Sequence, residues 1–409
     1  ADVIASVPAI TLAAFCQTEG MMAVMRAATA DRRMSRASCI VESGGIPAAA
    51  AYGEARTPSV LIVEIDQGAP DILASLKPLA EVCDPSTLVV VVGHVNDVVL
   101  YRELIRSGVA EYLAAPLTQL QVIDAIAGLF RDPATQPAGR IIAFIGAKGG
   151  AGSSTIAHNL SWLFANQAKV NTVITDLDLS FGTSGLNFNQ DVSSGLADAV
   201  SQSDRLDTAF LDRLLTRCGD NLSLLAGTAQ LERDVFLDAG TIDAVLDTLR
   251  QSAPIVAVDM PSSWSAWSRH TLVNADDVVI TATPDLASMR NARNIAELLR
   301  LSRQNDVPPY LVINQAGVPK RPEISAADFS KAVGIEPSVI IPFDPMNFGK
   351  SATTGMMLCE MAPKAKATEE IKALFAIMNA RSRTAPPKRR ATEQSLLSRL
   401  KSAISTGKN

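Results

Sequence analysis

The sequence predicts an α/β protein with two doubly wound domains, each built around a parallel sheet. Of the 409 residues, 47% are hydrophobic but only 5% are aromatic, and aliphatic runs of this kind suit parallel strands that helices cover on both faces. Apolar runs alternate with helix-like segments along the chain. The stretch 131–139 (RDPATQPAG) separates two such regions and indicates a boundary. We therefore expect domains over residues 1–132 and 140–383, a linker over 133–139 and a tail over 384–409.

The net charge and the cysteine spacing exclude some classes of protein. The formal net charge of −5 argues against a protein that binds nucleic acid over its whole surface. From Arg381 onward there are eight basic residues and one acid, so the tail is electrostatically distinct. Five scattered cysteines without a C-x-x-C pair predict reduced thiols in a cytoplasmic protein. No apolar run reaches the roughly 18 residues of a membrane span, and no signal peptide is visible. Because the chain begins at Ala1, we expect further N-terminal sequence.

The first domain shows strands alternating with helices, which is typical of a doubly wound unit. The predicted strands are Ile10–Cys16, Val60–Ile65, Leu88–Val92 and Glu111–Ala114. The predicted helices are Met21–Thr29, Asp71–Val82, Asp97–Ser107 and Gln119–Phe130.

One segment of this domain, GVAEYLAAPLTQLQVIDAI (Gly108–Ile126), resembles the last strand and helix of two-component receiver domains, which have a flavodoxin-like fold. In receivers a lysine precedes the proline, whereas Ala115 precedes Pro116 here. The phosphoacceptor aspartate of receivers ends the central strand, where this chain has Glu64, and Asp66 follows two residues later.

The acidic pair that binds magnesium in receivers is also displaced, because Cys16, Gln17 and Thr18 stand where it belongs and Glu19 is only nearby. Phosphoryl chemistry needs a carboxylate nucleophile, a metal held by acids and a cation over the phosphate. We therefore predict a pseudo-receiver that serves docking or dimerisation. A phosphorylation switch at Asp66 is the alternative.

The stretch Ile141–Asn159 (IIAFIGAKGGAGSSTIAHN) predicts a phosphate-binding loop between a buried strand and a helix. Bare glycine backbone lets several N–H groups face one anion, and the N-terminus of the helix adds a favourable dipole. The strict pattern G-x-x-x-x-G-K-[ST] fails at two positions, however. Ala147 replaces its first glycine and Ser153 replaces its lysine.

This loop resembles that of the deviant P-loop ATPases of the MinD/ParA class, which carry K-G-G-x-G-K-[ST]-[ST]. The resemblance implies that Lys148 reaches across a nucleotide-sandwich homodimer to the partner's phosphates. It also implies that Ser154 binds Mg²⁺ and that Thr155 lies near the α-phosphate. The residues predicted to cradle ATP or ADP are Lys148, Gly149, Gly150, Ala151, Gly152, Ser153, Ser154 and Thr155.

Downstream motifs follow in the order of the same class. Further strands are predicted at Thr172–Leu177, Ile255–Asp259, Asp276–Ala282 and Tyr310–Asn314. By resemblance, Asp176 and Asp259 belong to the magnesium site, and Asp178 positions the attacking water. Asn314 corresponds to the adenine contact, and Pro342, Phe343 and Asp344 to the loop that closes over the base.

Structural roles are the alternatives for several of these residues. Asp176 could cap a helix and Asp259 could serve a turn. Because both acids end strands beside the loop, a magnesium site is favoured. His158, one helical turn past the loop, is interpreted as structural. Trp264 and Trp267 either pack in a loop or lie at a partner surface.

The replacement at Ser153 bears on catalysis. A lysine there would stabilise charge that develops during phosphoryl transfer, and serine cannot. Loss of one such contact costs on the order of 10²–10³ in rate, by analogy with oxyanion donors. We therefore expect at most a slow ATPase, with Lys148 and Asp178 as its catalytic residues.

Together, GAKGGAGSST, DLDLSFGTSGLNFNQD and VDMPSSW, behind a receiver-like domain, resemble the CpaE/TadZ family. The resemblance implies a localisation factor of the Flp/Tad (type IVc) pilus machine, peripheral to the inner membrane at a cell pole. It would recruit the secretion ATPase and the inner-membrane platform. The alternatives are an active ParA/MinD-type ATPase that partitions DNA or cargo, which the acidic body disfavours, and a phosphorelay output protein.

The tail carries a possible amphipathic helix. Glu393–Ile404 (EQSLLSRLKSAI) places Leu396, Leu397, Leu400 and Ile404 on one helical face. With its basic residues, such a helix could lie on an anionic membrane. A solvated or partner-docking tail is the alternative.

Overall fold

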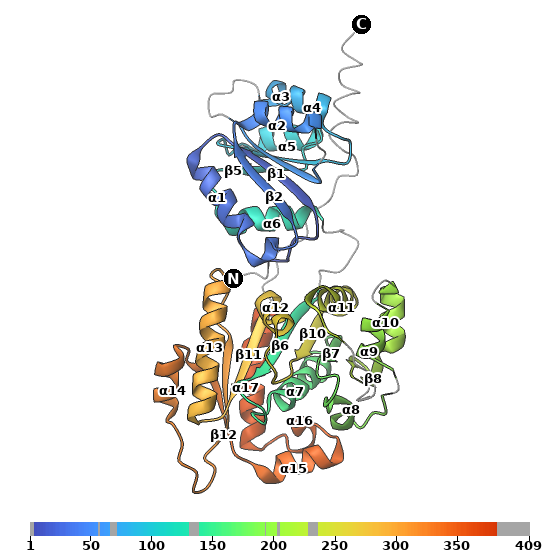
Figure 1. Ribbon diagram of the computed structural model, residues 1–409, viewed down its shortest axis with the longest axis vertical. Helices are drawn as coiled ribbons and strands as arrows, with labels where there is room; N and C mark the ends of the chain where they lie inside the picture. Colours follow the sequence, from blue (N-terminus) through green and yellow to red (C-terminus); the bar gives the residue numbers. More distant parts are fainter. Residues whose placement is uncertain are drawn as a thin grey trace. The chain divides into compact units, whose positions relative to one another are not determined.

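The computed structural model describes residues 4–55, 58–65, 72–130, 139–192, 194–202, 205–227 and 236–382. The chain divides into two compact units between residues 135 and 136 (Figure 1). Asp66, the predicted tail and all of the predicted linker except Gly139 lie outside the described residues. None of the described helices combines the length and the apolar character needed to cross a bilayer.

The first unit is a five-stranded parallel sheet in the order β2-β1-β3-β4-β5. This is the strand order of flavodoxin-like folds. Its strands are β1 (Thr11–Cys16), β2 (Ser38–Ser43), β3 (Val60–Glu64), β4 (Leu88–Gly93) and β5 (Glu111–Ala114). Its helices are α1 (Glu19–Thr29), the 3-10 helix η1 (Arg32–Met34), α2 (Gly45–Ala55), α3 (Ile72–Ser75), α4 (Lys77–Val82), α5 (Val98–Arg106) and α6 (Gln119–Leu129).

Helices cover both faces of this sheet (Figure 1). Alternate residues of the strands point to opposite faces. Leu12 and Ala14 pack with α1 and α6, whereas Ala13 and Phe15 pack with α2, α4 and α5. The predicted doubly wound arrangement of the first domain is therefore confirmed.

Two details of this unit differ from the sequence prediction. Strand β2 and helix α2 were missed, because β2 (SCIVES) is an edge strand without a fully buried residue and lacks a strong apolar run. The single helix predicted over Asp71–Val82 is instead two short helices, α3 and α4. Pro78 lies in the first turn of α4, and a proline there interrupts helical hydrogen bonding from the preceding turn.

The second unit is an eight-stranded sheet in the order β13-β12-β11-β6-β10-β7-β9-β8, parallel except for the β8–β9 pair. Its strands are β6 (Arg140–Gly146), β7 (Thr172–Asp176), β8 (Thr216–Gly219), β9 (Leu222–Leu225), β10 (Ile255–Asp259), β11 (Asp277–Ala282), β12 (Tyr310–Ala316) and β13 (Pro337–Pro342). Pro342, predicted in a loop, therefore ends a strand.

Helices again cover both faces of the sheet. They are α7 (Ser153–Asn166), α8 (Ser184–Asn187), α9 (Leu196–Ser201), α10 (Thr208–Leu214), α11 (Ala239–Ser252), α12 (Ala266–Asn274), α13 (Leu286–Ser302), α14 (Ala326–Val333), α15 (Pro345–Thr354), α16 (Leu358–Met361) and α17 (Lys366–Ser382). Helices α7, α16 and α17 share one core with the sheet, and α9 to α14 share the other.

Strand β6 lies at the centre of this arrangement. It pairs with β10 on one side and β11 on the other, so the chain winds outward in both directions from it. Crevices that bind ligands form at the carboxyl ends of parallel strands where the winding direction changes. The turn after β6 is the glycine-rich loop, which therefore lies at the expected place for a ligand.

Candidate functional site

A cavity of about 640 Å³ opens beside the glycine-rich loop. The cavity brings together all of the residues predicted to bind nucleotide and magnesium or to position the attacking water. Those residues are Lys148, Gly149, Gly150, Ala151, Gly152, Ser153, Ser154, Thr155, Asp176, Asp178, Asp259, Asn314, Pro342, Phe343 and Asp344.

The backbone of the loop needs its glycines. Gly150 and Gly152 have φ values of 76° and 94°, in the left-handed region that glycine adopts most readily. A Cβ on Gly152 would also lie 2.4 Å from Nδ2 of Asn314. Helix α7 begins at the next residue, Ser153, so its unpaired N–H groups and dipole face the cavity.

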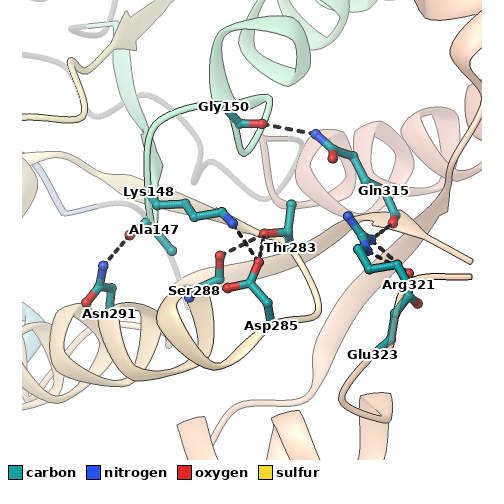
Figure 2. Close-up of polar contacts among 10 residues, drawn as sticks. All are labelled: Ala147, Lys148, Gly150, Thr283, Asp285, Ser288, Asn291, Gln315, Arg321 and Glu323. Atoms are coloured by element: carbon teal, nitrogen blue, oxygen red, sulfur yellow. Dashed lines mark hydrogen bonds and ion pairs between the residues drawn. The ribbon is translucent and has the colours of Figure 1, made fainter. Parts of the chain in front are cut away.

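Side chains from other elements hold three carbonyl groups of the loop. Asn291 of α13 donates to Ala147 O at 2.8 Å, and Gln315 donates to Gly150 O at 3.0 Å (Figure 2). Asn314 Nδ2 donates to Ala151 O at 2.9 Å. The loop is therefore anchored without any ligand.

Two of these anchors were not predicted from the sequence, and the third, Asn314, was predicted for a different contact. Asn291 and Gln315 belong to no motif, so no signal indicated them. Asn314, expected at adenine, uses its amide nitrogen to hold the loop, while its Oδ1 is buried without a hydrogen bond among the described residues. Contact between Asn314 and adenine stays a prediction.

Lys148 forms an ion pair within its own chain. Its Nζ lies 2.6 Å from Oδ2 of Asp285, which also accepts a hydrogen bond from Thr283 (Figure 2). The other carboxylate oxygen of Asp285 caps α13 by accepting from Ser288 N at 2.9 Å. Burial alone would raise the pKa of Asp285, but the hydrogen bonds from Lys148, Ser288 and Thr283 hold it well below its usual range.

Ser153 leaves the loop without a second cation. Its side chain is buried, and its Oγ has no hydrogen bond among the described residues. Of the described residues that line the cavity, Lys148 is the sole lysine or arginine.

Asp176 and Asp259 end adjacent strands and are paired in register. Both carboxyl groups are buried, with exposed fractions of 2% and 3%. Oδ1 of Asp176 accepts from Asp178 N, and its Oδ2 accepts from Ser184 Oγ at 2.6 Å. Oδ1 of Asp259 has no hydrogen bond among the described residues.

Burial and mutual repulsion make these carboxylates receptive to a cation. Burial first, and then the charge of Asp176, raise the pKa of Asp259 well above its usual range, against a hydrogen bond from Ser154. Burial likewise raises the pKa of Asp176, against its hydrogen bonds with Ser184 and Asp178. A nearby divalent cation would favour the ionised forms.

The donor set fits magnesium in the presence of phosphate. Among the described residues, no three His, Cys, Asp or Glu side chains are grouped to hold a metal alone. Magnesium commonly uses one or two carboxylates and completes its shell with phosphate and water. Asp259 with its unpaired Oδ1, Asp176 and the Ser154 hydroxyl meet that requirement.

The remaining predicted residues have defined local contacts. Asp178 accepts a hydrogen bond from Phe181 N at 3.0 Å. Asp344 caps α15 and is engaged by Asn347, and Phe343 is 38% exposed at the cavity.

The two tryptophans after β10 differ in their packing. Trp267 lies in helix α12 rather than in a loop, and it packs against the core. Trp264 is 53% exposed, and a partner surface there stays a prediction.

In the first unit, Glu64 occupies the position of the receiver phosphoacceptor and is fully engaged. Its carboxylate accepts hydrogen bonds from Gln17 N at 2.6 Å, and from the backbone and hydroxyl of Thr18 at 2.8 Å each. The two backbone N–H groups donate to Oε2, whereas the Thr18 hydroxyl donates to Oε1, which also lies 3.1 Å from His94 Nε2. The side chain is 1% exposed, so it holds the loop after β1 rather than facing solvent.

Comparison with known proteins identifies the fold of the second unit. Residues 139–307 match the family model of an AAA domain. A ParA family ATPase from Chlorobium tepidum has a TM-score of 0.52 and 25% identity, and the match covers 59% of this chain and 98% of that chain. MinD from Pyrococcus horikoshii, solved with Mg-ADP, has a TM-score of 0.52 at 18% identity over 59% and 96% of the two chains. The second unit has the MinD/ParA P-loop fold.

Two further comparisons concern sequence. A crystal structure of the pilus assembly protein CpaE from Caulobacter crescentus is 50% identical over 31% of this chain and 98% of that chain, with a TM-score of 0.30. The uncharacterized protein MT3760 from Mycobacterium tuberculosis is 31% identical over 41% of this chain. The chain spans about half of that relative, 46% of its length.

Proposed function

We propose that this protein is an ATP-binding localisation and assembly scaffold of a Flp/Tad (type IVc) pilus machine. The observation that carries the proposal is the convergence of the anchored loop, Asp176 and Asp259 on one cavity in the MinD/ParA-like unit. The sequence identity between the N-terminal part and a pilus assembly protein supports the choice of machine.

The cavity residues divide into three groups in this proposal. The backbone of the loop binds the phosphates of ATP or ADP, and Thr155 lies near the α-phosphate. Ser154, Asp176 and Asp259 hold Mg²⁺, which when bound neutralises phosphate charge. Pro342, Phe343 and Asp344 enclose the base, and the buried Oδ1 of Asn314 is the atom of that side chain still able to accept from it.

Hydrolysis is slow or absent in this proposal. Ser153 supplies no charge to the phosphates of its own site, and Lys148 is paired with Asp285. Lys148 would act on the phosphates of a second copy, so a homodimer with sandwiched ATP is the active form. Asp178 would orient the attacking water. ATP therefore gates dimerisation rather than driving repeated turnover.

The partners follow from the CpaE-like sequence. The dimer recruits the secretion ATPase and the inner-membrane platform at a cell pole, from a cytoplasmic position beside the inner membrane. The basic tail after residue 383 supplies a contact with the membrane surface. No nucleic acid is required, in keeping with the net charge of −5.

The test is ATP binding and dimerisation of the full chain, measured by calorimetry and sedimentation with Mg²⁺. We expect ATP to bind and to convert monomer to dimer, and Lys148→Ala to abolish the dimer while retaining ATP binding. Lys331→Ala, an exposed lysine on α14 outside the cavity, is the matched control. Failure of the wild type to bind ATP would overturn the proposal. ATP-dependent, salt-sensitive DNA binding would instead favour a partitioning ATPase.

A further inference from the structure

His158 is a buried histidine that no motif explains. It lies in α7, one turn beyond the glycine loop, and is 1% exposed. Its ring contacts three residues of the segment 184–188. Nε2 lies 2.9 Å from Ser184 Oγ, Nδ1 lies 3.3 Å from Asn187 Nδ2, and the ring meets that of Phe188 edge-on at 5.2 Å.

The hydrogen bonds around this ring have a defined direction. With Asp176 ionised, as a metal ligand must be, its Oδ2 can only accept, so the Ser184 hydroxyl donates to it at 2.6 Å. Ser184 Oγ therefore accepts from His158 Nε2. The amide nitrogen of Asn187 is a donor, so Nδ1 accepts from it. The ring is then neutral, and its burial lowers the pKa to about 4.

We propose that His158 is a positioning residue that orients Asp176 through Ser184 and thereby sets the affinity of the nucleotide site for Mg²⁺. This inference rests on the proposed function, because it requires a nucleotide–magnesium site at Asp176. It extends that function by linking the helix that follows the phosphate loop to the segment that follows β7. Groups that orient a ligand in this way change metal affinity by roughly 10–100-fold when they are removed.

Among the described residues, the geometry allows one hydrogen-bonded path from His158 to the acidic side chains. His158 Nε2 is 3.8 Å from Oδ2 of Asp259, which is too far for a hydrogen bond. The connection to the acids therefore runs through Ser184. Ser184 donates two hydrogen bonds to Asp176, because its backbone N–H also donates to Oδ2 at 3.3 Å.

The test measures how binding of a fluorescent ATP analogue to the full chain depends on Mg²⁺ concentration, with affinity in excess EDTA as a second readout. His158→Leu removes the donor, and Ser184→Ala removes the relay. Each should raise the Mg²⁺ midpoint by roughly 10–100-fold while affinity in EDTA stays unchanged. His158→Gln, which restores a donor near the position of Nε2, should recover most of the loss.

Two further variants separate positioning from simple packing. The double variant His158→Leu/Ser184→Ala should be no worse than either single change, because both interrupt one path. Ser161→Ala is the matched control, since Ser161 is buried in the same helix and its hydroxyl donates to the backbone oxygen of Ala157. It should leave the midpoint unchanged. If His158→Leu fails to fold by circular dichroism, Ser184→Ala and His158→Gln decide the outcome.

Several results would overturn the inference. A Mg²⁺ midpoint that is unchanged in both single variants, an additive double variant, or an equal loss of affinity in EDTA would each exclude a positioning role. These failures are distinct from failure of the proposed function, which would show as absence of ATP binding by the wild type.

Discussion

Lys148 Nζ lies 2.6 Å from Asp285 Oδ2, although 137 positions separate the two residues in the chain. The contact joins the phosphate loop to the first turn of α13 (Figure 2). It is partly exposed, with side-chain exposures of 39% and 31%, so it is available for exchange. In this conformation Lys148, the sole lysine among the described residues that line the cavity, is paired within its own chain.

Replacement of Asp285 by Asn should favour the ATP-bound dimer. Asparagine preserves the cap of α13, since its carbonyl accepts from Ser288 N, but it removes the charge that holds Lys148. Each protomer holds one such pair, and an exposed ion pair contributes about 1 kcal/mol or less, so the dimer dissociation constant should fall by no more than about 30-fold. Sedimentation with ATP and Mg²⁺ measures this change. Asp212→Asn, at an exposed acid of the same unit, is the control, and weaker dimerisation would contradict the expectation.

The Lys148–Asp285 pair should respond to acid but not to pH near neutrality. Hydrogen bonds hold the pKa of Asp285 below its usual range. A carboxyl with a lowered folded-state pKa stabilises the fold above its unfolded pKa of about 3.9, and this contribution is lost as pH falls through the folded value. Thermal unfolding of wild type and Asp285→Asn should therefore differ by a constant amount from pH 5 to 8 and converge only below about pH 4. A difference that varies across neutral pH would contradict this assignment.

Ser153→Lys should restore catalysis. Lysine at this position adds a cation beside the phosphates, and such a contact is worth on the order of 10²–10³ in rate. Single-turnover hydrolysis of ATP should rise by that factor, whereas Lys148→Ala should reduce what activity there is. Fast wild-type turnover that survives Lys148→Ala would show that the missing lysine is not what limits the rate.

Glu64→Ala should destabilise the first unit strongly. The change leaves backbone N–H groups of Gln17 and Thr18 without their acceptor, and losing hydrogen bonds to a buried charged group costs about 3 kcal/mol. Urea unfolding of the full chain measures the loss of stability in the transition that reports unfolding of the first unit. Glu19→Ala, at an exposed neighbour, should change stability little. A near-neutral Glu64→Ala would mean that the carboxylate does not hold this loop.

The fold was predictable wherever a local pattern reports a buried element. Strands β1, β3, β4, β6, β7 and β10 are apolar runs in sequence and fully or almost fully buried in the structure. Strands β2, β8 and β13 escaped prediction because they lie at sheet edges and are partly exposed. Strand β9 was missed although it is internal and mostly buried, because its four residues form too short an apolar run. An edge strand needs few apolar residues, so its sequence resembles that of a loop.

The candidate site was also predictable only in part. Motif spacing indicated the loop residues, Asp176 and Asp259, because their positions are set by strand ends. The contacts that Asp285, Asn291 and Gln315 make with the loop join residues more than 130 positions apart, and no local pattern records such pairs. His158 was interpreted as structural because one helical position carries no information about its contact with Ser184.

The three side chains that hold the loop carbonyls have a thermodynamic consequence. Ordering a backbone costs roughly 1–2 kcal/mol of conformational entropy per residue. Because Asn291, Asn314 and Gln315 fix the loop in the folded chain, that cost falls on folding and not on association. A ligand therefore meets a preorganised surface. Association should be fast and should leave the backbone conformation of the loop unchanged.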